Sequence, residues 1–249
     1  MPGDRVVIVG AGVAGLVSAF ALAARGLDVT VLERGTSVGG KMRQVEIGQA
    51  LIDSGPTVFT MRSVFEELFA TAGKNFADHV RLRPLEILAR HAWDEHARLD
   101  LFADEERTID AIGDFAGVAE ADGYRAFCRD TKRIYEILEK PFLRASQPSM
   151  GGLIGADGLR GLMRLPQIKP FSSMWSALGR YFADLRLQQL FGRYATYCGS
   201  SPYLAPATLM LVRAPSERRC AQGRRAVPKS SSRAGSGTSR HRSPRCALK

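Results

Sequence analysis

The chain has 249 residues, of which 45% are hydrophobic and 24% are charged, and its formal net charge is +10. This length allows one or two domains with a sizeable core, and the composition excludes a fibrous or wholly disordered protein. The longest apolar run, at residues 13–24, is shorter than the roughly 20 residues that a membrane-spanning helix needs, so we expect no spanning segment.

The positive charge is concentrated at the end of the chain. Residues 213–249 contain eleven Lys or Arg and one acid, whereas residues 1–212 contain 24 basic and 24 acidic residues. The net charge therefore does not indicate a nucleic-acid-binding body. The four cysteines fit neither C-x-x-C nor a metal-ligand spacing, which is typical of a reducing cytoplasm. The first predicted strand starts too early to leave room for a signal peptide, so we expect a cytoplasmic protein.

The predicted elements begin with a strand and a helix joined by a glycine-rich turn. Residues 6–9 form a β-branched run suited to a parallel strand that is buried on both faces. Gly10, Gly12 and Gly15 follow in the G-x-G-x-x-G spacing. These glycines allow a tight turn, a close approach of pyrophosphate to the backbone, and close packing of the helix on the strand. The helix is expected at residues 14–25, with its N-terminal amides facing the phosphates.

A second strand and an acid complete this pattern. Residues 28–32 form the expected strand, and Glu33 follows it where an acid would bind ribose hydroxyls. Because the strand, the glycine turn, the helix, the second strand and the acid follow one another at the expected spacing, residues 6–33 predict dinucleotide binding. Residues 39–43, with two glycines and two basic residues, predict another close backbone approach beside phosphate charge. Taken alone, this loop is interpreted equally well as a surface loop with incidental basic residues.

The next elements are a hairpin, a turn and a helix. Alternating residues predict strands at 44–47 and 50–53. Gly55 and Pro56 form a turn dipeptide, for which a simple turn is the first interpretation. A helix is expected from residue 63 to residue 72, because Gly73 ends its apolar pattern.

Two strands and two long helices are predicted in the following part of the chain. The strands are expected at residues 83–91 and 97–103, paired around an acidic turn, and the helices at residues 124–138 and 175–189. No metal is predicted, because metal-ligand spacing is absent among three neighbouring histidines, namely His79, His91 and His96.

Two regions lack this periodicity. Residues 150–170 are short apolar pieces broken by Gly, Pro and Arg, suited to a substrate channel, a membrane-surface contact or packing between domains. Residues 213–249 are rich in Arg, Ser, Ala, Gly and Pro, so we expect a basic, low-complexity, disordered tail. A basic arm for nucleic acid or anionic lipid is one interpretation of the tail, but aromatic residues for base stacking are absent. We favour a reading-frame shift in GC-rich coding DNA, because the periodic pattern stops abruptly.

A family resemblance refines this reading. The glycines at 10, 12 and 15, Glu33 and the Gly-Gly-Lys-Met-Arg run at 39–43 resemble the signature of two-dinucleotide-domain flavoproteins, such as amine oxidases and carotenoid desaturases. The runs at 53–62 and 197–207 are similar to bacterial carotenoid desaturases, especially those that act on hydroxylated or methoxylated neurosporene. The resemblance covers residues 1–212.

The resemblance implies an α/β fold, with a Rossmann-like FAD-binding domain, a mixed α+β substrate domain and an incomplete C-terminal part. The implied boundaries are residues 1–95 for the FAD-binding portion and 96–212 for the substrate portion, followed by the tail. FAD is the implied cofactor, with Glu33 on the adenosine ribose. The implied cofactor-binding residues are Gly10, Ala11, Gly12, Val13, Ala14, Gly15, Glu33, Arg34, Gly39, Gly40, Lys41, Met42, Arg43, Gly55, Pro56 and Thr57.

The function implied by the resemblance is an FAD-dependent desaturase that forms a C–C double bond in an acyclic carotenoid, namely 1-hydroxy- or 1-methoxyneurosporene. No catalytic residue is predicted, because neither a Ser-His-Asp arrangement nor a carboxylate pair stands out. The apolar carotenoid substrate favours peripheral contact with the cytoplasmic membrane, and no nucleic-acid partner is expected. The alternatives are a phytoene desaturase, a flavin amine oxidase, or an inactive FAD-fold fragment whose basic tail binds nucleic acid or membrane.

Overall fold

The computed structural model describes residues 4–56, 58–59, 61–145, 147, 165–213, 220–222 and 246–248. The chain forms two compact units, the first of residues 1–84 together with 217–249 and the second of residues 85–216. The sequence placed a domain boundary between residues 95 and 96, within a β-hairpin that lies wholly in the second unit. A boundary there would separate two strands that are hydrogen-bonded to each other, so the hairpin stays with one unit.

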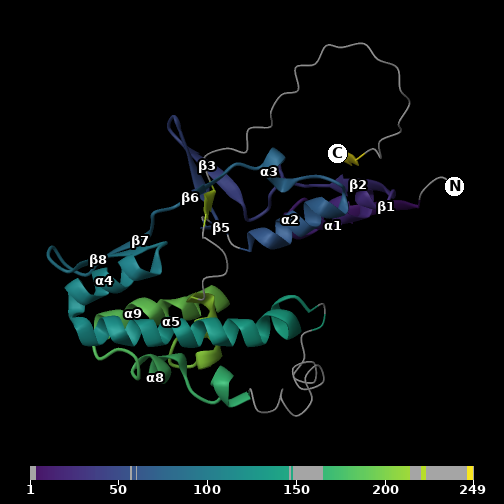
Figure 1. The fold of residues 1–249 in the computed structure, drawn as a ribbon. Helices are drawn as coiled ribbons and strands as arrows, with labels where there is room; N and C mark the ends of the chain where they lie inside the picture. The colour runs from purple at the N-terminus through teal and green to yellow at the C-terminus, as the bar shows by residue number, and fades with distance from the viewer. Residues whose placement is uncertain are drawn as a thin grey trace. The chain divides into compact units, whose positions relative to one another are not determined.

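The first unit is built on a small parallel sheet. Strand β1 (Arg5–Val9) pairs in parallel with β2 (Asp28–Leu32), and helix α1 (Val13–Ala24) connects them (Figure 1). The predicted strand–helix–strand order is thus confirmed. The prediction that β1 is buried on both faces is wrong, because its side chains alternate between exposed and half-buried and Val9 is 84% exposed. The small core of this unit consists of Ala11, Ala19, Val29 and Val31, with partly buried neighbours from β1 and α1.

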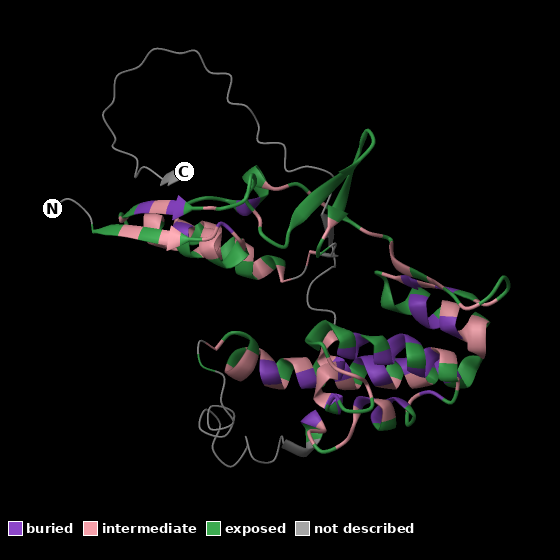
Figure 2. Cartoon of the chain, turned by 180° about the vertical axis from the view of Figure 1, so that it is seen from behind, coloured by how far each residue is buried: buried purple, intermediate pink, exposed green. Residues whose placement is uncertain are grey.

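The rest of the first unit is a hairpin and short elements. The predicted hairpin is confirmed as β3 (Arg43–Ile47) and β4 (Ala50–Ser54), which pair antiparallel and are almost entirely exposed (Figure 2). The remaining elements are β5 (Val58–Phe59), α2 (Arg62–Thr71), α3 (Phe76–His79) and β6 (Leu82–Pro84).

Two short strands lie in the range that the sequence predicts to be a disordered tail. Strand β9 (Cys220–Gln222) pairs antiparallel with β5 and β6, and β10 (Cys246–Leu248) pairs in parallel with β2. The expectation of a tail without strands is therefore wrong at these two places. Strand pairing uses backbone N–H and C=O groups, so an edge strand can recruit a segment that shows no apolar periodicity.

The second unit is a hairpin packed with helices. The predicted hairpin is confirmed as β7 (Ile87–Ala92) and β8 (Arg98–Phe102). Its helical elements are α4 (Glu105–Ala116), α5 (Val118–Leu138), η1 (Glu139–Leu143), η2 (Leu165–Ile168), α8 (Met174–Leu178), α9 (Leu185–Gly192), η3 (Arg193–Cys198) and η4 (Ala207–Arg213). Among the described residues, no helix combines the length and apolarity needed to cross a membrane.

Helix α5 is at the centre of the second unit's core. Its side chains Tyr124, Phe127 and Ile134 are fully buried, and Phe127 contacts the rings of Phe182 and Phe191. Figure 2 shows this burial as purple faces on the helices of the unit. The predicted core face of the helix at residues 124–138 is therefore confirmed.

The single helix predicted at residues 175–189 is wrong, because the chain breaks there into α8 and α9. The Asp184 side chain accepts a hydrogen bond from the N–H of Arg186 at 2.8 Å and caps the start of α9. Between the two helices, Phe182 turns into the core and is fully buried. An N-cap aspartate satisfies amides that have no intrahelical acceptor, so a new helix start is favoured over continuation of α8.

Candidate functional site

The first glycine loop, residues 10–15, joins β1 to α1 and is shaped by two of its glycines. Gly10 has a φ of 99°, and its N–H donates to the Leu32 carbonyl at 2.7 Å. A Cβ at Gly15 would lie 2.0 Å from the Gly10 carbonyl oxygen. These two positions therefore require glycine, one for its backbone conformation and one for the close packing of the helix start on the turn.

The outer side of the first glycine loop is open. A Cβ at Gly10 or at Gly12 would meet nothing within 4 Å. Helix α1 has no side-chain cap at Gly12 and no acidic residue in its first turn, where Val13 and Ala14 are exposed. The first amides of a helix have no intrahelical acceptor and carry the positive end of the helix dipole. This open space beside uncapped amides fits an anionic group such as a diphosphate.

The second glycine loop, residues 39–43, lies against the first. The Gly39 N–H donates to the Ala11 carbonyl at 2.8 Å, and Gly12 and Gly39 form a parallel β-bridge. A Cβ at Gly40 would come within 3.1 Å of the Gly12 Cα atom, and Gly39 and Gly40 both have positive φ. The two glycine loops are thus joined through their backbones, which the interpretation as an unrelated surface loop does not explain.

Gly55 also belongs to this assembly. A Cβ at Gly55 would lie 2.1 Å from the Lys41 carbonyl oxygen, so the chain after β4 packs directly on the second glycine loop. Sequence reasoning without the family resemblance favoured a simple turn at this position. The requirement for glycine therefore arises from a contact between segments that are distant in the sequence.

The carboxylate of Glu33 connects the end of β2 to the first glycine loop. Its Oε2 accepts the Ala11 N–H and its Oε1 accepts the Gly35 N–H, both at 2.7 Å. These two donors, Gly35 first and Ala11 second, lower the pKa of Glu33, so it is ionised at neutral pH. An ionised carboxylate accepts about four hydrogen bonds, so these two bonds leave capacity for ribose hydroxyls.

The other predicted cofactor-binding residues are exposed where the structure describes them. The side chains of Arg34, Lys41, Met42, Arg43 and Pro56 are exposed, and Thr57 lies outside the described residues. The structure therefore brings together the glycines of both loops, Glu33 and Gly55. Pairing of the basic side chains with a phosphate stays a prediction.

Sequence reasoning did not find a polar cluster in the second unit. The Asp130 Oδ2 atom accepts from Lys169 Nζ at 2.7 Å and from the Tyr181 hydroxyl at 2.5 Å, and Lys169 also contacts that hydroxyl. Burial raises the pKa of Asp130, but the hydrogen bonds from Lys169 and Tyr181 outweigh it and hold this pKa below its usual value. Lys169 has a φ of 51°, an uncommon conformation for a residue with a side chain. These residues come from three separate segments, so no local pattern could have indicated the cluster.

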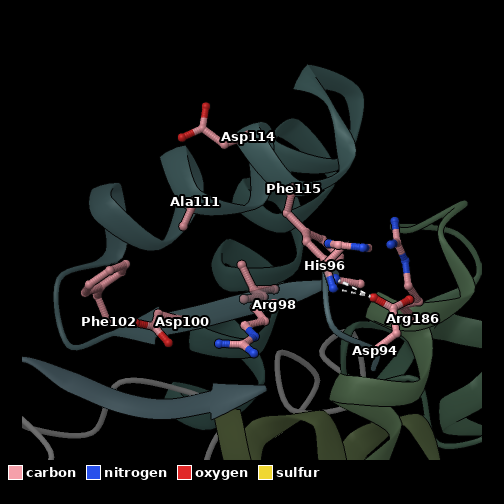
Figure 3. Close-up of a pocket in the computed structure, with 11 residues that line it drawn as sticks. Asp94, His96, Arg98, Asp100, Phe102, Ala111, Asp114, Phe115 and Arg186 are labelled. Atoms are coloured by element: carbon pink, nitrogen blue, oxygen red, sulfur yellow. Dashed lines mark hydrogen bonds between the residues drawn. The ribbon is translucent and has the colours of Figure 1, made fainter. Parts of the chain in front are cut away.

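A surface hollow of about 620 Å³ also lies in the second unit, between β8 and α4 (Figure 3). Its lining includes Asp94, Asp100, Asp114, Arg98 and Arg186, so it is unsuited to an apolar ligand. The Asp94 carboxylate already accepts two backbone N–H groups of its own turn. In the part of the chain that the structure describes, no three His, Cys, Asp or Glu side chains are placed to hold a metal ion.

Comparisons with known proteins agree with this geometry. Residues 8–73 match the NAD(P)-binding Rossmann-like domain, a range that contains both glycine loops. The chain is 57% identical over 209 residues to a hydroxyneurosporene desaturase of Rubrivivax gelatinosus, covering 84% of this chain and 40% of that protein. It is 40% identical over 208 residues to a hydroxyneurosporene desaturase of Cereibacter sphaeroides, covering 84% of this chain and 42% of that one.

A solved structure shares the fold. The chain superposes on a double mutant of putrescine oxidase with a TM-score of 0.50 and 18% identity, covering 84% of this chain and 40% of that chain. The fold class predicted from the sequence, a Rossmann-like domain within a mixed helix-and-strand protein, is confirmed by these matches. The chain spans about two fifths of the length of the curated relatives it matches.

Proposed function

We propose that this chain is an FAD-dependent desaturase acting on an acyclic carotenoid, because 84% of it aligns with hydroxyneurosporene desaturases at 57% and 40% identity. The expected substrate is 1-hydroxy- or 1-methoxyneurosporene, in which a new C–C double bond is formed. The observation that carries the proposal is the identity of 57% over 209 residues to a hydroxyneurosporene desaturase. The match of residues 8–73, which contain both glycine loops, to the NAD(P)-binding Rossmann-like domain supports it.

FAD is the proposed dinucleotide, and the first unit would hold its adenosine diphosphate end. The open space above Gly10 and Gly12, beside the uncapped start of α1, supports a diphosphate there. The unused acceptor capacity of Glu33 supports a bond to ribose hydroxyls. The further residues that we assign to the cofactor are Ala11, Val13, Ala14, Gly15, Arg34, Gly39, Gly40, Lys41, Met42, Arg43, Gly55, Pro56 and Thr57.

The chemistry needs an acceptor for two hydrogens, which bound FAD supplies. The chain's own residues would bind the cofactor and orient it. The backbone bond from Gly39 to Ala11 holds the two glycine loops together before any ligand enters, so little ordering is needed on binding. Lys41 and Arg43 place positive charge beside the proposed diphosphate. No side chain of this chain is assigned as an acid or base.

The second unit is the proposed substrate-binding part. An apolar carotenoid partitions into lipid, so we propose a protein that lies peripherally on the cytoplasmic face of a membrane. The lack of a spanning helix among the described residues is compatible with that arrangement.

The proposal is tested by pigment analysis in a bacterial host that accumulates 1-hydroxyneurosporene. Expression of this chain should convert that pigment to a product with a longer conjugated system, seen as a red-shifted absorption spectrum. A Gly12→Asp variant is the matched control, because a carboxylate in the open space of the first glycine loop would repel a diphosphate. Unchanged pigment with the wild-type chain, or equal conversion by the variant, would contradict the proposal.

A further inference from the structure

Two neighbouring loops of the second unit expose large apolar side chains. We call residues 169–175 and 201–207 the loop pair. Phe171 is fully exposed (101%) and Leu204 is 83% exposed, and Tyr203 beside Leu204 is exposed as well. Isolated exposed apolar residues are common, but an exposed group on adjacent segments indicates a contact surface.

The loop pair is fixed by its own backbone. The Met174 N–H donates to the Ala205 carbonyl and the Ala207 N–H donates to the Ser172 carbonyl, both at 2.8 Å. Between these bonds, Ser173 and Pro206 form an antiparallel β-bridge. Met174, Ala205 and Ala207 are fully buried in the core of the unit. Because these residues anchor both segments inside, the neighbouring Phe171 and Leu204 are held outside in a defined position.

An aromatic pair supports the same surface. The rings of Trp175 and Tyr203 lie 4.9 Å apart, with Tyr203 on the exposed side of the pair. Tyrosine and tryptophan combine an apolar ring with a polar group, so they favour the boundary between an apolar phase and water.

The charge of this part of the chain is distinct from the rest of its unit. Residues 165–213 contain five basic residues and a single acid, Asp184, which pairs with Arg186 at 2.5 Å. Residues 85–145 of the same unit contain nine basic residues and 14 acids. The apolar loop pair therefore belongs to a positively charged segment, whereas the hairpin, α4 and α5 are acidic.

We propose that the loop pair is the membrane-docking surface of this protein, with Phe171 and Leu204 entering the headgroup region of an anionic bilayer. Exposed aromatic and aliphatic side chains in a segment of net positive charge are a combination that favours interfacial binding to an anionic bilayer. The sequence analysis suggested a membrane contact at residues 150–170, of which residues 150–164 lie outside the described part of the chain, so that suggestion stays a prediction. The loop pair lies mostly beyond that range. The inference rests on the proposed function, because an apolar carotenoid substrate explains why the protein would bind a bilayer. Binding of the loop pair to the bilayer requires neither bound cofactor nor turnover.

The test is cosedimentation of the purified full chain with vesicles of phosphatidylcholine, with and without added phosphatidylglycerol. The double variant Phe171→Ser/Leu204→Ser should bind the mixed vesicles at least about tenfold more weakly, since two large apolar side chains no longer enter the interface. The matched control is Val118→Ser/Leu185→Ser, which removes two apolar side chains that are 75% and 67% exposed elsewhere in the same unit. The control should bind like the wild type.

The basic residues at 213–249 can attract anionic vesicles without the loop pair. The comparison is therefore repeated at high salt, where interactions between exposed charges are screened. Equal binding by the double variant and the wild type would overturn the proposal, as would no wild-type binding to either vesicle. Self-association that the double variant abolishes would assign the loop pair to contacts between copies instead. If the wild-type chain binds vesicles but does not convert the pigment, the proposed function is contradicted, whereas the assignment of the loop pair as a membrane-docking surface is still supported.

Discussion

The substitution Gly12→Ala should separate cofactor binding from folding. A Cβ at Gly12 meets nothing within 4 Å, and the φ of −72° suits alanine, so the free energy of unfolding should stay within about 1 kcal/mol of the wild type. If the diphosphate of FAD occupies the open space there, the added methyl group overlaps it. The affinity for FAD should then fall about 10- to 100-fold, which corresponds to the roughly 1–3 kcal/mol of an overpacked contact.

The matched substitution Gly15→Ala should instead lower the stability of the first unit. Its Cβ would lie 2.0 Å from the Gly10 carbonyl oxygen, whereas ordinary contacts of this kind begin near 3.4 Å. The obstacle is backbone and cannot rotate away, so the start of α1 must move. The expected destabilisation of the first unit is about 3 kcal/mol or more, the upper part of the range for overpacking.

Amide hydrogen exchange measured by mass spectrometry on peptides from α1 reports the stability of the first unit. Both tryptophans, Trp93 and Trp175, lie in the second unit, so their fluorescence shows in parallel that this unit stays folded. FAD affinity is measured on the same samples by flavin fluorescence. A diphosphate site above Gly12 is refuted if Gly12→Ala loosens α1 as much as Gly15→Ala does, or if Gly12→Ala leaves the affinity for FAD unchanged.

Three further results are expected. The lowered pKa of Glu33 means that its stabilising contribution is complete above the ordinary value of 4.5 and is lost as the pH falls through the lowered value, so Glu33→Gln should flatten the acid side of a plot of Tm against pH, followed by circular dichroism. Phe127→Ala should cost about 3–5 kcal/mol in urea unfolding followed by tryptophan fluorescence, while the exposed Leu185→Ala should change it by less than about 0.5 kcal/mol; similar costs would contradict the assigned core. Burial raises the pKa of Cys128, so iodoacetamide at neutral pH should label the exposed Cys198 and spare Cys128 in the native chain, and labelling of both would place Cys128 at the surface.

The first glycine loop was predictable because its constraints are local. The turn at Gly10 and the packing at Gly15 follow from a strand that leads directly into a helix, and sequence spacing records that geometry. The contact of Gly39 with Ala11 and the need for glycine at position 55 arise between distant segments. The family resemblance could suggest these positions, but spacing alone could not.

Other features could not be read from the sequence, for physical reasons. The exposure of Val9 depends on which layer covers the outer face of β1, and a β-branched run is compatible with either outcome. The break between α8 and α9 depends on whether Asp184 caps a helix or sits within one, and both are common roles for aspartate. The Lys169 cluster depends on the packing of a loop onto α5, for which periodicity has no signal.

The central claim is that the first unit holds the adenosine diphosphate end of FAD. The most direct measurement titrates FAD into the purified chain and follows flavin fluorescence, with NAD⁺ as competitor. Saturable binding of FAD that NAD⁺ does not displace is the predicted result. Equal displacement by NAD⁺, or no binding of FAD by a chain whose α1 amides remain protected, would contradict the claim.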